Sequence, residues 1–440
     1  MRMETKRKGW NPVGIIAMAL SLFLPNVSCT ATEKGRVVLE LKQGTLSLIP
    51  LERNAVRVQF AQPGAAPMPE LVYTESRPVP EYEVSEDEHS LLLSMEGISV
   101  EFDKSTEALT FKDGSHRVIL REKAGGRSVS ASSVQGEPTF RVEQRFVSPK
   151  DEYLYGTGQF QDGYLNIRGL SRRLTQVNTQ ISIPFILSNK GYGLLWNNYG
   201  LTDFNPADNT VEPTPASASG EAVVVNATST SGNVKETRQT YSFTASLEVP
   251  HTGRYSLLLD VGQRMARKYY LSIDGKEVFD FNNLWLPPTT SAIVELSAGR
   301  HAVVVQGERN DKPVLHWRPV TEETVFRSPV ARALDYTVFA GNGEEVIATY
   351  RKLTGPSPMM PLWSLGYIHC RERYNTQAEL LENAREFRQR KLPVDVIVQD
   401  WQYWGKHGWN AMRFDEERYP EPEKMMQELH DMDMRLMISV

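Results

Sequence analysis

One aspartate in the sequence stands where a carboxylate can bind a ligand. In "VIVQDWQYWG", residues 396–405, three apolar residues and a glutamine lead into Asp400, and Trp401, Tyr403 and Trp404 follow it closely. An ionised carboxylate accepts two hydroxyl hydrogen bonds in a fixed fork, and flat aromatic rings stack against the C–H faces of sugars. The stretch therefore predicts a carbohydrate pocket. The alternatives are an aspartate that caps a turn or pairs with an arginine, and an aromatic mini-core beneath the loop.

The elements that position Asp400 alternate between strand and helix in the last part of the sequence. In chain order they are "SLGYIH", "TQAELLENAREFRQRK", "VDVIVQDW", "EPEKMMQELHDM" and "RLMISV". The first helix opens with Thr376 and Glu379 at capping-box spacing, and the second has Pro422 in its first turn. The mostly apolar strand before Asp400 is typical of a parallel sheet that is buried on both faces. Asp400 is thus expected at the C-terminal end of the second parallel strand, where α/β folds bind ligands.

Most of the preceding sequence alternates apolar and polar residues in short segments, as antiparallel strands do. The segments from Arg36 to about Thr210 predict a β-sandwich. A stretch rich in proline, alanine and serine at 211–222 predicts a boundary, and strands resume after it. Within this second set, Asp274-Gly275 predicts a hairpin turn, because both of its residues favour positive φ. "GEEVIATYRKLTG" predicts a helix that ends at its glycine.

These patterns predict a multidomain protein, as a length of 440 residues suggests at roughly 100–200 residues per domain. An N-terminal antiparallel β-sandwich contains an inserted β-sandwich module, and the first β-α-β-α-β part of a parallel fold follows. The expected divisions are 30–221 for the sandwich, 222–330 for the module, 331–355 for a return segment with a connecting helix, and 356–440 for the last part. The third parallel strand has no helix to cover it, so we expect a piece of a longer protein.

Residues 1–29 predict a secretory signal. Arg2, Lys6, Arg7 and Lys8 precede the apolar run "VGIIAMALSLFLP", which is too short to span a bilayer comfortably. A buried N-terminal helix is disfavoured, because cationic flanks fit a core poorly. Cys29 follows the run and is a candidate for lipidation in a bacterial lipoprotein; cleavage nearby is the alternative. The expected location is periplasmic or at the cell surface, with a lipid anchor at Cys29 as the only expected contact with a membrane.

Charge and cysteine content exclude other classes of protein. The net charge of −5 comes from scattered residues and leaves no basic stripe for nucleic acid. Two cysteines, Cys29 and Cys370, cannot build a disulfide framework. We expect Cys370 to be a buried small hydrophobe and His369 to be a hydrogen-bonded core histidine. No metal site and no cofactor is implied, and the sequence does not indicate an oligomeric state.

The chain resembles glycoside hydrolase family 31. "PLWSLGYIHCRERY", "NAREFRQRKLPVDVIVQDWQYWG" and "FDEERYPEPEKMMQELHDMDMRLMISV" look like the first three strands and two helices of that family's (β/α)8 barrel. Upstream, "YLYGTGQFQDGYLNIRG" and "TQVNTQISIPFILSNKGYGLLWNNYG" resemble its N-terminal sandwich. The module at 222–330 is similar to the protective-antigen-like module, chiefly in "YYLSIDGKEVFD". The resemblance covers nearly all of the chain after the signal.

This resemblance implies a retaining α-glycosidase with two catalytic aspartates, whose carboxyl groups lie about 5–5.5 Å apart. In the family both come from later barrel strands, and neither motif occurs in residues 1–440. No catalytic residue is therefore assigned within this chain, and the chain alone is predicted to be inactive. Asp400 matches the family's strand-two aspartate, which binds hydroxyl groups of the non-reducing sugar.

Two departures from the family's α-glucosidase motifs favour xylose over glucose. Trp401 stands where many α-glucosidases have a smaller aliphatic residue, and its indole would fill the space of the C6 hydroxymethyl group that xylose lacks. Glu372 stands where many of them have an aromatic residue. The predicted substrate-binding residues are Asp400, Trp401, Trp404 and Glu372. The predicted function is that of an exported α-xylosidase that removes non-reducing α-xylosyl residues from xyloglucan-type oligosaccharides.

Other interpretations stay open. One is an α-glucosidase or another α-glycosidase of the same family, and another is a non-catalytic carbohydrate-binding surface protein. A third is an open flavodoxin-like sheet for residues 362–440. It is disfavoured because "HCRERYNT", after the first strand, is bulky and charged where a phosphate-binding loop would be rich in glycine.

Overall fold

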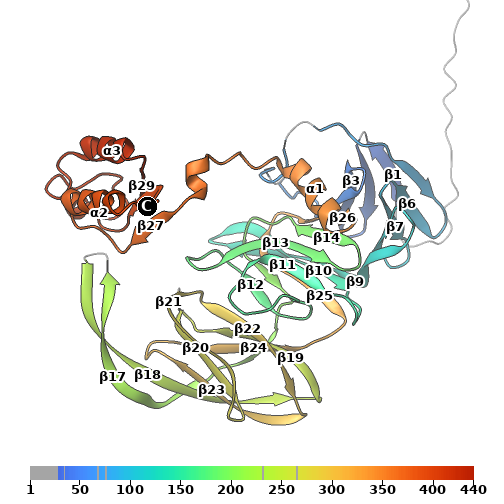
Figure 1. Ribbon diagram of the computed structural model, residues 1–440. Coiled ribbons are helices and arrows are strands. Elements are labelled where there is room, and N and C mark those ends of the chain that lie inside the picture. The colour runs from blue at the N-terminus through green and yellow to red at the C-terminus, as the bar shows by residue number, and fades with distance from the viewer. Residues whose placement is uncertain (1–27, 34, 67–68, 75–76, 230–231, 264–265) are drawn as a thin grey trace, which may run out of the picture.

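A computed structural model describes residues 28–33, 35–66, 69–74, 77–229, 232–263 and 266–440 (Figure 1). Nearly all of the predicted signal lies outside these residues, and so does the side chain of Cys29, so export and lipidation stay predictions. The described strands are antiparallel except in one three-stranded sheet near the C-terminus. No helix in the described ranges is long and apolar enough to cross a membrane.

The first sandwich consists of two large sheets. The eight-stranded sheet has the order β1-β2-β3-β4-β26-β14-β13-β11, and the nine-stranded sheet has the order β12-β15-β25-β10-β9-β8-β7-β6-β5. The strands of the eight-stranded sheet are β1 (Ser28–Glu33), β2 (Arg36–Leu41), β3 (Gly44–Glu52), β4 (Ala55–Ala61), β11 (Leu154–Gln159), β13 (Ile181–Ser188), β14 (Tyr192–Trp196) and β26 (Leu334–Ala340). Those of the nine-stranded sheet are β5 (Glu83–Glu86), β6 (Ser90–Ser94), β7 (Ile98–Asp103), β8 (Leu109–Asp113), β9 (Val118–Val134), β10 (Glu137–Val147), β12 (Arg172–Leu174), β15 (Thr202–Phe204) and β25 (Glu323–Ala331).

Alternation of side chains builds the core between these two sheets. In β4, Val56 and Val58 are fully buried while the polar residues between and after them are partly exposed, as the period of two in a strand requires. Aromatic rings fill the centre, where Trp196 stacks on Phe326 and Tyr336 at centroid distances of 5.5 and 6.5 Å. The antiparallel N-terminal sandwich predicted from the alternating pattern is confirmed.

A second, smaller sandwich lies between β15 and β25 along the chain and has a hydrophobic core of its own. Its four-stranded sheet has the order β16-β24-β19-β22, and its five-stranded sheet has the order β17-β18-β23-β20-β21. The strands are β16 (Asn209–Val211), β17 (Thr214–Ser229), β18 (Gly232–Val249), β19 (Gly253–Asp260), β20 (Ala266–Ile273), β21 (Lys276–Leu286), β22 (Thr289–Leu296), β23 (Gly299–Gly307) and β24 (Val314–Pro319). The predicted hairpin joins β20 to β21, with φ of 51° at Asp274 and 77° at Gly275.

The chain crosses from the first sandwich to the second and later back again. Strand pairing places both of these crossings earlier in the sequence than predicted. The stretch 211–222, predicted as a boundary, forms the end of β16 and the first half of β17, and β17 and β18 make a long hairpin (Figure 1). Proline is compatible with β17 because this strand lies at a sheet edge and pairs on one side only. At the other crossing, β25 pairs with β10 and β15, so residues 323–330 belong with the first sandwich. A likeness of the module to the protective antigen stays a proposal.

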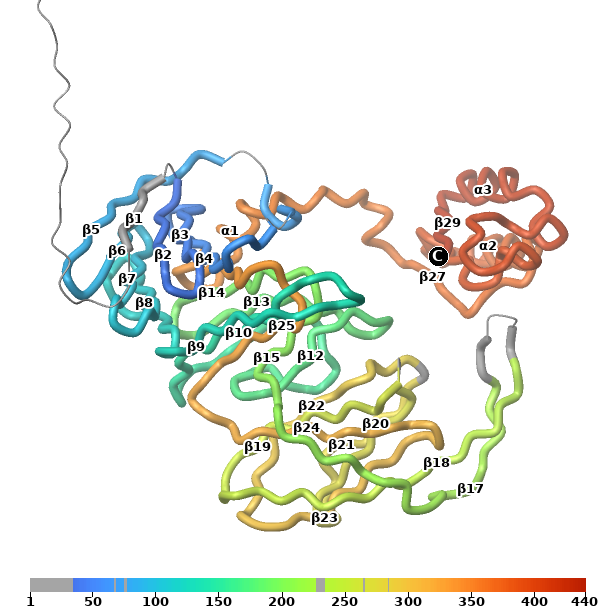
Figure 2. The backbone as a smooth tube through the Cα atoms, turned by 180° about the vertical axis from the view of Figure 1, so that it is seen from behind, coloured from blue at the N-terminus to red at the C-terminus, as the bar shows by residue number. Residues whose placement is uncertain are grey.

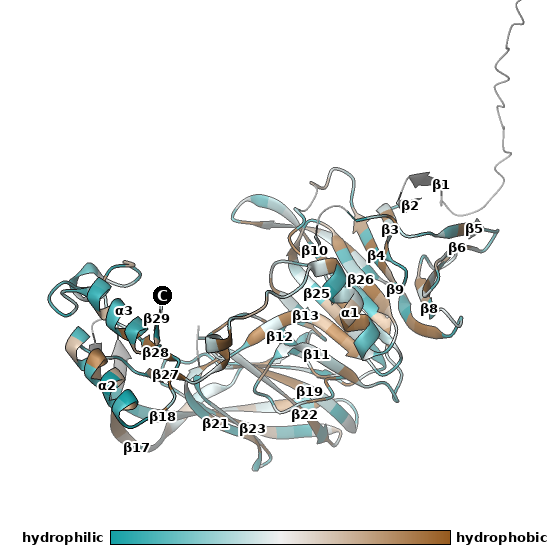
Figure 3. Cartoon of the chain, turned by 45° about the horizontal axis from the view of Figure 1, so that its top comes forward, coloured by the Kyte–Doolittle hydropathy of each residue, from teal (hydrophilic) through white to brown (hydrophobic). Residues whose placement is uncertain are grey.

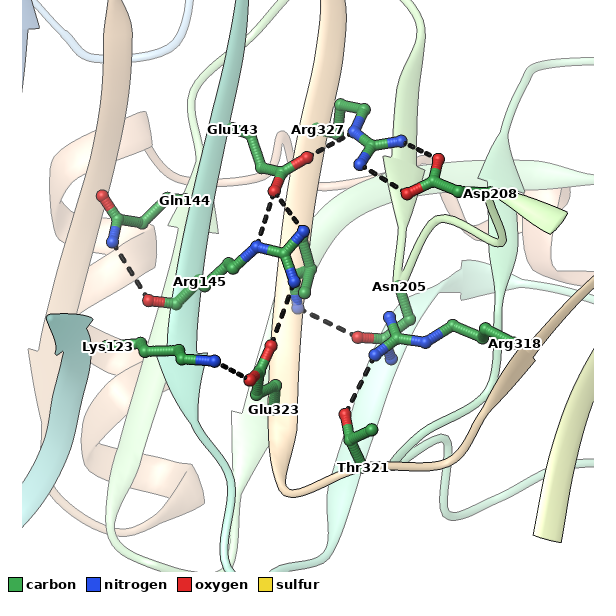
Figure 4. A network of polar contacts seen from close by, with 11 residues as sticks. Lys123, Glu143, Gln144, Arg145, Asn205, Asp208, Arg318, Thr321, Glu323 and Arg327 are labelled. Carbon is green, nitrogen blue, oxygen red and sulfur yellow. Dashed lines mark hydrogen bonds and ion pairs between the residues drawn. The ribbon is translucent and has the colours of Figure 1, made fainter. Parts of the chain in front are cut away.

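An ionic network connects the strands at these crossings (Figure 4). Arg327 on β25 bonds to Glu143 on β10 and to Asp208, which precedes β16. Arg145 on β10 bonds to the same Glu143 and to Glu323 at the start of β25. Each of these charges therefore has an opposite charge beside it.

Helix α1 (Gly343–Thr354) follows β26 and packs on the first sandwich through Val346 and Leu353, both fully buried. Gly355 follows its last residue, as the sequence predicts, and Asn342 and Glu345 form a capping box at its start, which was not predicted. Beyond Gly355 an extended stretch leads to the C-terminal part of the chain, which Figure 2 shows as a separate body.

This C-terminal part contains a parallel sheet in the order β27 (Ile368–Arg371), β28 (Val396–Gln399) and β29 (Arg435–Ile438), with the strands in register. Helices α2 (Gln377–Gln389) and α3 (Pro422–Asp431) connect the strands. Each helix carries hydrophilic and hydrophobic residues (Figure 3), and the apolar ones pack with Ile397 of β28. The predicted order of strands and helices is confirmed.

Two local details differ from the predictions. The 3-10 helix η1 (Leu362–Leu365) occupies the start of the first predicted strand, so β27 begins only at Ile368. At the start of α2, the Thr376 hydroxyl accepts a hydrogen bond from the backbone of Glu379, but the Glu379 carboxylate accepts from Asn375 instead of closing the capping box. Arg371 also bonds to this carboxylate and competes for it.

Candidate functional site

The C-terminal ends of β27, β28 and β29 meet at one edge of the parallel sheet, with Arg371, Gln399 and Ile438 in register. Asp400 directly follows β28 at this edge and is half-buried, as the sequence predicts. Among the described residues, no hydrogen bond and no ion pair reaches its carboxylate. Its negative charge acts on Cys370: desolvation of the thiol, together with the Asp400 charge, raises the pKa of Cys370. Asp400 therefore presents an open pair of acceptor oxygens at the strand ends.

The backbone after Asp400 turns through two left-handed residues. Trp401 and Gln402 have φ of 53° and 57°, although neither is glycine. Each such residue costs on the order of 1–3 kcal/mol and persists only where surrounding contacts impose it. One such contact is visible: the Trp401 N–H donates to the Ser439 hydroxyl, just beyond β29, at 3.1 Å. The turn is thus a strained feature next to an unpaired carboxylate, a combination typical of ligand sites.

Three tryptophans form one cluster beside this turn. The Trp401 ring packs edge-on against Trp404 and Trp409, at centroid distances of 5.4 and 4.6 Å, and the latter two rings are nearly parallel. Trp404 is only 2% exposed and packs against the other two rings; its role in substrate binding stays a prediction. Trp409 is 55% exposed and was missed by the sequence analysis. Its presence as a third tryptophan in the same connecting loop was the signal that could have identified it.

Asp415 holds the loop that carries these rings. Its buried carboxylate accepts hydrogen bonds from the backbone N–H groups of Lys406, Glu417 and Arg418. These bonds, that of Lys406 first, hold the pKa of Asp415 below its ordinary value. Gly405 lies so close that an added Cβ would stand 1.9 Å from the Asp415 carboxylate, and its φ is +46°. The aromatic loop therefore depends on an internal anchor that the sequence analysis did not identify.

The residues after β27 occupy the neighbouring strand end. Glu372 is exposed and lies 3.5 Å from the Arg373 guanidinium; its role in substrate binding stays a prediction. His369 is half-buried, with Nδ1 3.1 Å from the Tyr367 hydroxyl and its ring against Phe387. Cys370, predicted to be buried, is exposed. It pairs with Val398, on the sheet face opposite to that of Ile397, which packs with α2 and α3.

Two segments of the chain match domains of a single family. Residues 357–440 match the glycosyl hydrolases family 31 TIM-barrel domain. Residues 45–205 match the glycosyl hydrolase 31 N-terminal galactose mutarotase-like domain. The second sandwich occupies most of the interval between the two matches.

Individual relatives carry the same family signature. An alpha-xylosidase of Saccharolobus solfataricus is 29% identical over 361 residues, which cover 79% of this chain and 33% of that protein. The crystal structure of a GH31 alpha-xylosidase from Xanthomonas citri matches with a TM-score of 0.77 and 27% identity over 91% of this chain and 48% of that one. The crystal structure of a GH31 alpha-xylosidase from a soil metagenome, complexed with xylose, matches with a TM-score of 0.62 and 23% identity over 94% of this chain and 47% of that one.

The chain thus spans about a third to a half of the length of these relatives. The two matched domains cover most strands of the first sandwich and the whole parallel sheet, and the site at the end of β28 lies in the second of them. The chain belongs to glycoside hydrolase family 31, of which it carries the N-terminal mutarotase-like domain and the start of the TIM barrel.

Proposed function

We propose that this chain is the N-terminal portion of a retaining α-glycosidase, an α-xylosidase that removes non-reducing α-xylosyl residues from xyloglucan-type oligosaccharides. The observation that carries the proposal is the open carboxylate of Asp400 at the end of β28, beside the Trp401 indole. A carboxylate without a protein partner can accept hydrogen bonds from two adjacent sugar hydroxyls. The names of the relatives in Saccharolobus solfataricus and Xanthomonas citri support the xyloside preference.

Asp400 binds and does not react in this proposal. In a retaining mechanism one carboxylate attacks the anomeric carbon while a carboxylic acid protonates the leaving oxygen, and water then releases the sugar with the second group acting as base. We place both of these groups outside residues 1–440. Asp400 orients the sugar for them, and its charged hydrogen bonds strengthen as the ring distorts toward the transition state.

Trp401 excludes the larger sugar in this proposal. Its ring is wedged against Trp404 and Trp409 and its backbone is held by Ser439, so the indole has little freedom to move aside. A pocket wall of this kind rejects one extra hydroxymethyl group by roughly 1–3 kcal/mol. Glucosides would then be turned over slowly and xylosides quickly.

Export is part of the same proposal. The basic and apolar start of the sequence would direct the enzyme out of the cytoplasm. N-terminal sequencing of the mature protein from the host, with radiolabelled palmitate as a second readout, would locate the cleavage site and report on Cys29. A mature protein that retains Met1 would contradict export.

The function is tested by assaying the full-length enzyme with matched aryl α-xyloside and α-glucoside. We expect kcat/KM to favour the xyloside, and residues 1–440 alone to turn over neither substrate. A preference for the glucoside would favour the α-glucosidase alternative. Binding of xyloglucan oligosaccharides without turnover of any α-glycoside would favour the non-catalytic binding protein.

A further inference from the structure

Gln399 is the last residue of β28 and is fully buried. Successive side chains of a strand point to opposite faces of the sheet. Ile397 packs into the core beneath α2 and α3, so Gln399 shares this helix-covered face. By the same alternation, we expect the side chain of Asp400, the next residue, on the opposite face, away from the helices. Gln399 therefore lies behind the site and is not placed to touch a sugar.

The Gln399 amide instead bonds to the backbone on which the site is built. Its Nε2 donates to the Tyr374 carbonyl at 3.0 Å and to the Asp400 carbonyl at 3.2 Å. Two carbonyl acceptors fix the orientation of the amide, because its oxygen cannot replace the nitrogen there. Oε1 is buried, and no described residue donates a hydrogen bond to it.

These two bonds connect neighbouring strand ends. Tyr374 lies in the loop after β27, and its carbonyl also accepts from the Tyr419 hydroxyl at 2.5 Å. On the other side, the Ser439 N–H donates to the Gln399 carbonyl at 3.3 Å while the Ser439 hydroxyl holds Trp401. The end of β28 is thus held from both flanks, directly before the left-handed turn.

We propose that Gln399 is a positioning residue: by holding the carbonyls of Tyr374 and Asp400, it sets the direction of the Asp400 carboxylate and keeps the Trp401 indole in place. This inference rests on the proposed function, in which Asp400 binds sugar hydroxyls and Trp401 excludes C6. Displacing a binding group by about 1 Å can cost on the order of 100-fold in rate. The role of Gln399 should therefore be visible in catalysis and in substrate preference as well as in stability.

The test compares Gln399→Met with a matched control in the full-length enzyme. Methionine keeps the length of the side chain and removes its donor. The control is Gln144→Met: Gln144 is also fully buried, its Nε2 donates to the carbonyl of the following residue at 3.0 Å, and its Oε1 is also unpartnered (Figure 4). Gln144 lies on β10 in the first sandwich, away from the strand ends.

We expect both variants to lower the melting temperature. Well below that temperature, Gln399→Met should reduce kcat/KM on the aryl α-xyloside by about 100-fold, mostly through kcat, and bring the xyloside-to-glucoside ratio closer to one. Gln144→Met should change neither. Equal kinetics of the two variants would overturn the inference while leaving the proposed function intact.

A wild-type enzyme that is inert on all α-glycosides would overturn the proposed function instead. The inference is then decided by a crystal structure of Gln399→Met. An Asp400 carboxylate and a left-handed turn that are unchanged there would overturn it, and a rearranged turn at Trp401 and Gln402 would support it.

Discussion

A carboxylate in the first sandwich and the carboxylate at the end of β28 differ in whether protein groups donate hydrogen bonds to them. Asp335 in β26 is 2% exposed and accepts hydrogen bonds from Arg57, Gln59 and Asn197. Asp400 has no such partner among the described residues, although it too is partly withdrawn from water. Removal of a carboxylate whose acceptor capacity is filled by the protein destabilises the fold, whereas a carboxylate left open is available to a ligand.

Two tryptophans show the same contrast. Trp196 is fully buried in the first sandwich, and its Nε1 donates to the Ser328 hydroxyl at 2.9 Å. The Nε1 of Trp401 is also buried, but no described residue accepts a hydrogen bond from it. Buried indole N–H groups usually find an acceptor. The Trp401 indole thus differs from that of Trp196 as the Asp400 carboxylate differs from that of Asp335.

The largest expected effect comes from the open carboxylate. Asp400→Ala in the full-length enzyme should lower kcat/KM on the aryl α-xyloside by about 10²–10³-fold or more, because charged contacts to the sugar tighten in the transition state. The free energy of unfolding should hardly change, since no partner is left unpaired. Steady-state kinetics and chemical denaturation measure the two quantities. A large loss of stability with retained kcat/KM would mean that Asp400 is a structural carboxylate like Asp335 and not a ligand-binding one.

Substitution of Asp335, whose carboxylate is hydrogen-bonded by protein groups, should affect stability instead of activity. Asp335→Ala removes one of the two carboxylates that pair with Arg57; the other is Glu70. The substitution should lower the free energy of unfolding by about 3–5 kcal/mol. Burial lowers the pKa of Arg57 while its contacts with Asp335 and Glu70 raise it. A guanidinium stays charged at neutral pH, so without Asp335 only Glu70 would compensate this charge. Adding Arg57→Met should recover part of the loss. Denaturation of both variants provides the measurement, and an Asp335→Ala protein of wild-type stability would contradict the prediction.

The sequence predicted the regular parts of this molecule better than its crossings and its site. Alternation and helical period follow from which faces are buried, so the strands, α1 and the parallel order were recognisable. The crossings at Asp208 and Glu323 depend on pairing between strands far apart in the chain, which local composition does not report. At the site, the residue types around Asp400 were visible, but which ring is exposed was not. Burial of Trp404 and exposure of Trp409 follow from the loop anchored by Asp415.

Trp401 offers a smaller and more selective effect. Trp401→Ile should raise activity on the α-glucoside relative to the α-xyloside by about 10- to 200-fold, if the indole occupies the C6 space. kcat/KM for both substrates in wild type and variant gives this ratio. An equal loss on both substrates would mean that the ring only supports the loop. Trp409→Ile, which also removes a ring from the cluster, is the matched control and should leave the ratio nearer to that of the wild type.

The smallest expected effect concerns Asp274, a carboxylate that is hydrogen-bonded to a histidine whose charge changes with pH. In the second sandwich, Asp274 lies 2.6 Å from Nδ1 of His301, and the His301 Nε2 lies 2.8 Å from the Ser297 carbonyl. The hydrogen bond to Asp274, first among the causes, raises the pKa of His301, while the same bond lowers the pKa of Asp274.

Because the folded-state pKa of His301 lies above its unfolded value of about 6.5, the protonated pair stabilises the module fully below that pH. The stabilisation is lost as pH rises through the folded-state pKa. Asp274 is half exposed, so solvent keeps the effect modest. Calorimetry at pH 6 and at pH 8.5 should show a lower melting temperature at the higher pH, and His301→Gln should reduce this difference. An unchanged difference in the variant would mean that the pair, although filled, contributes nothing measurable, and that filled acceptor capacity alone does not identify a stabilising carboxylate.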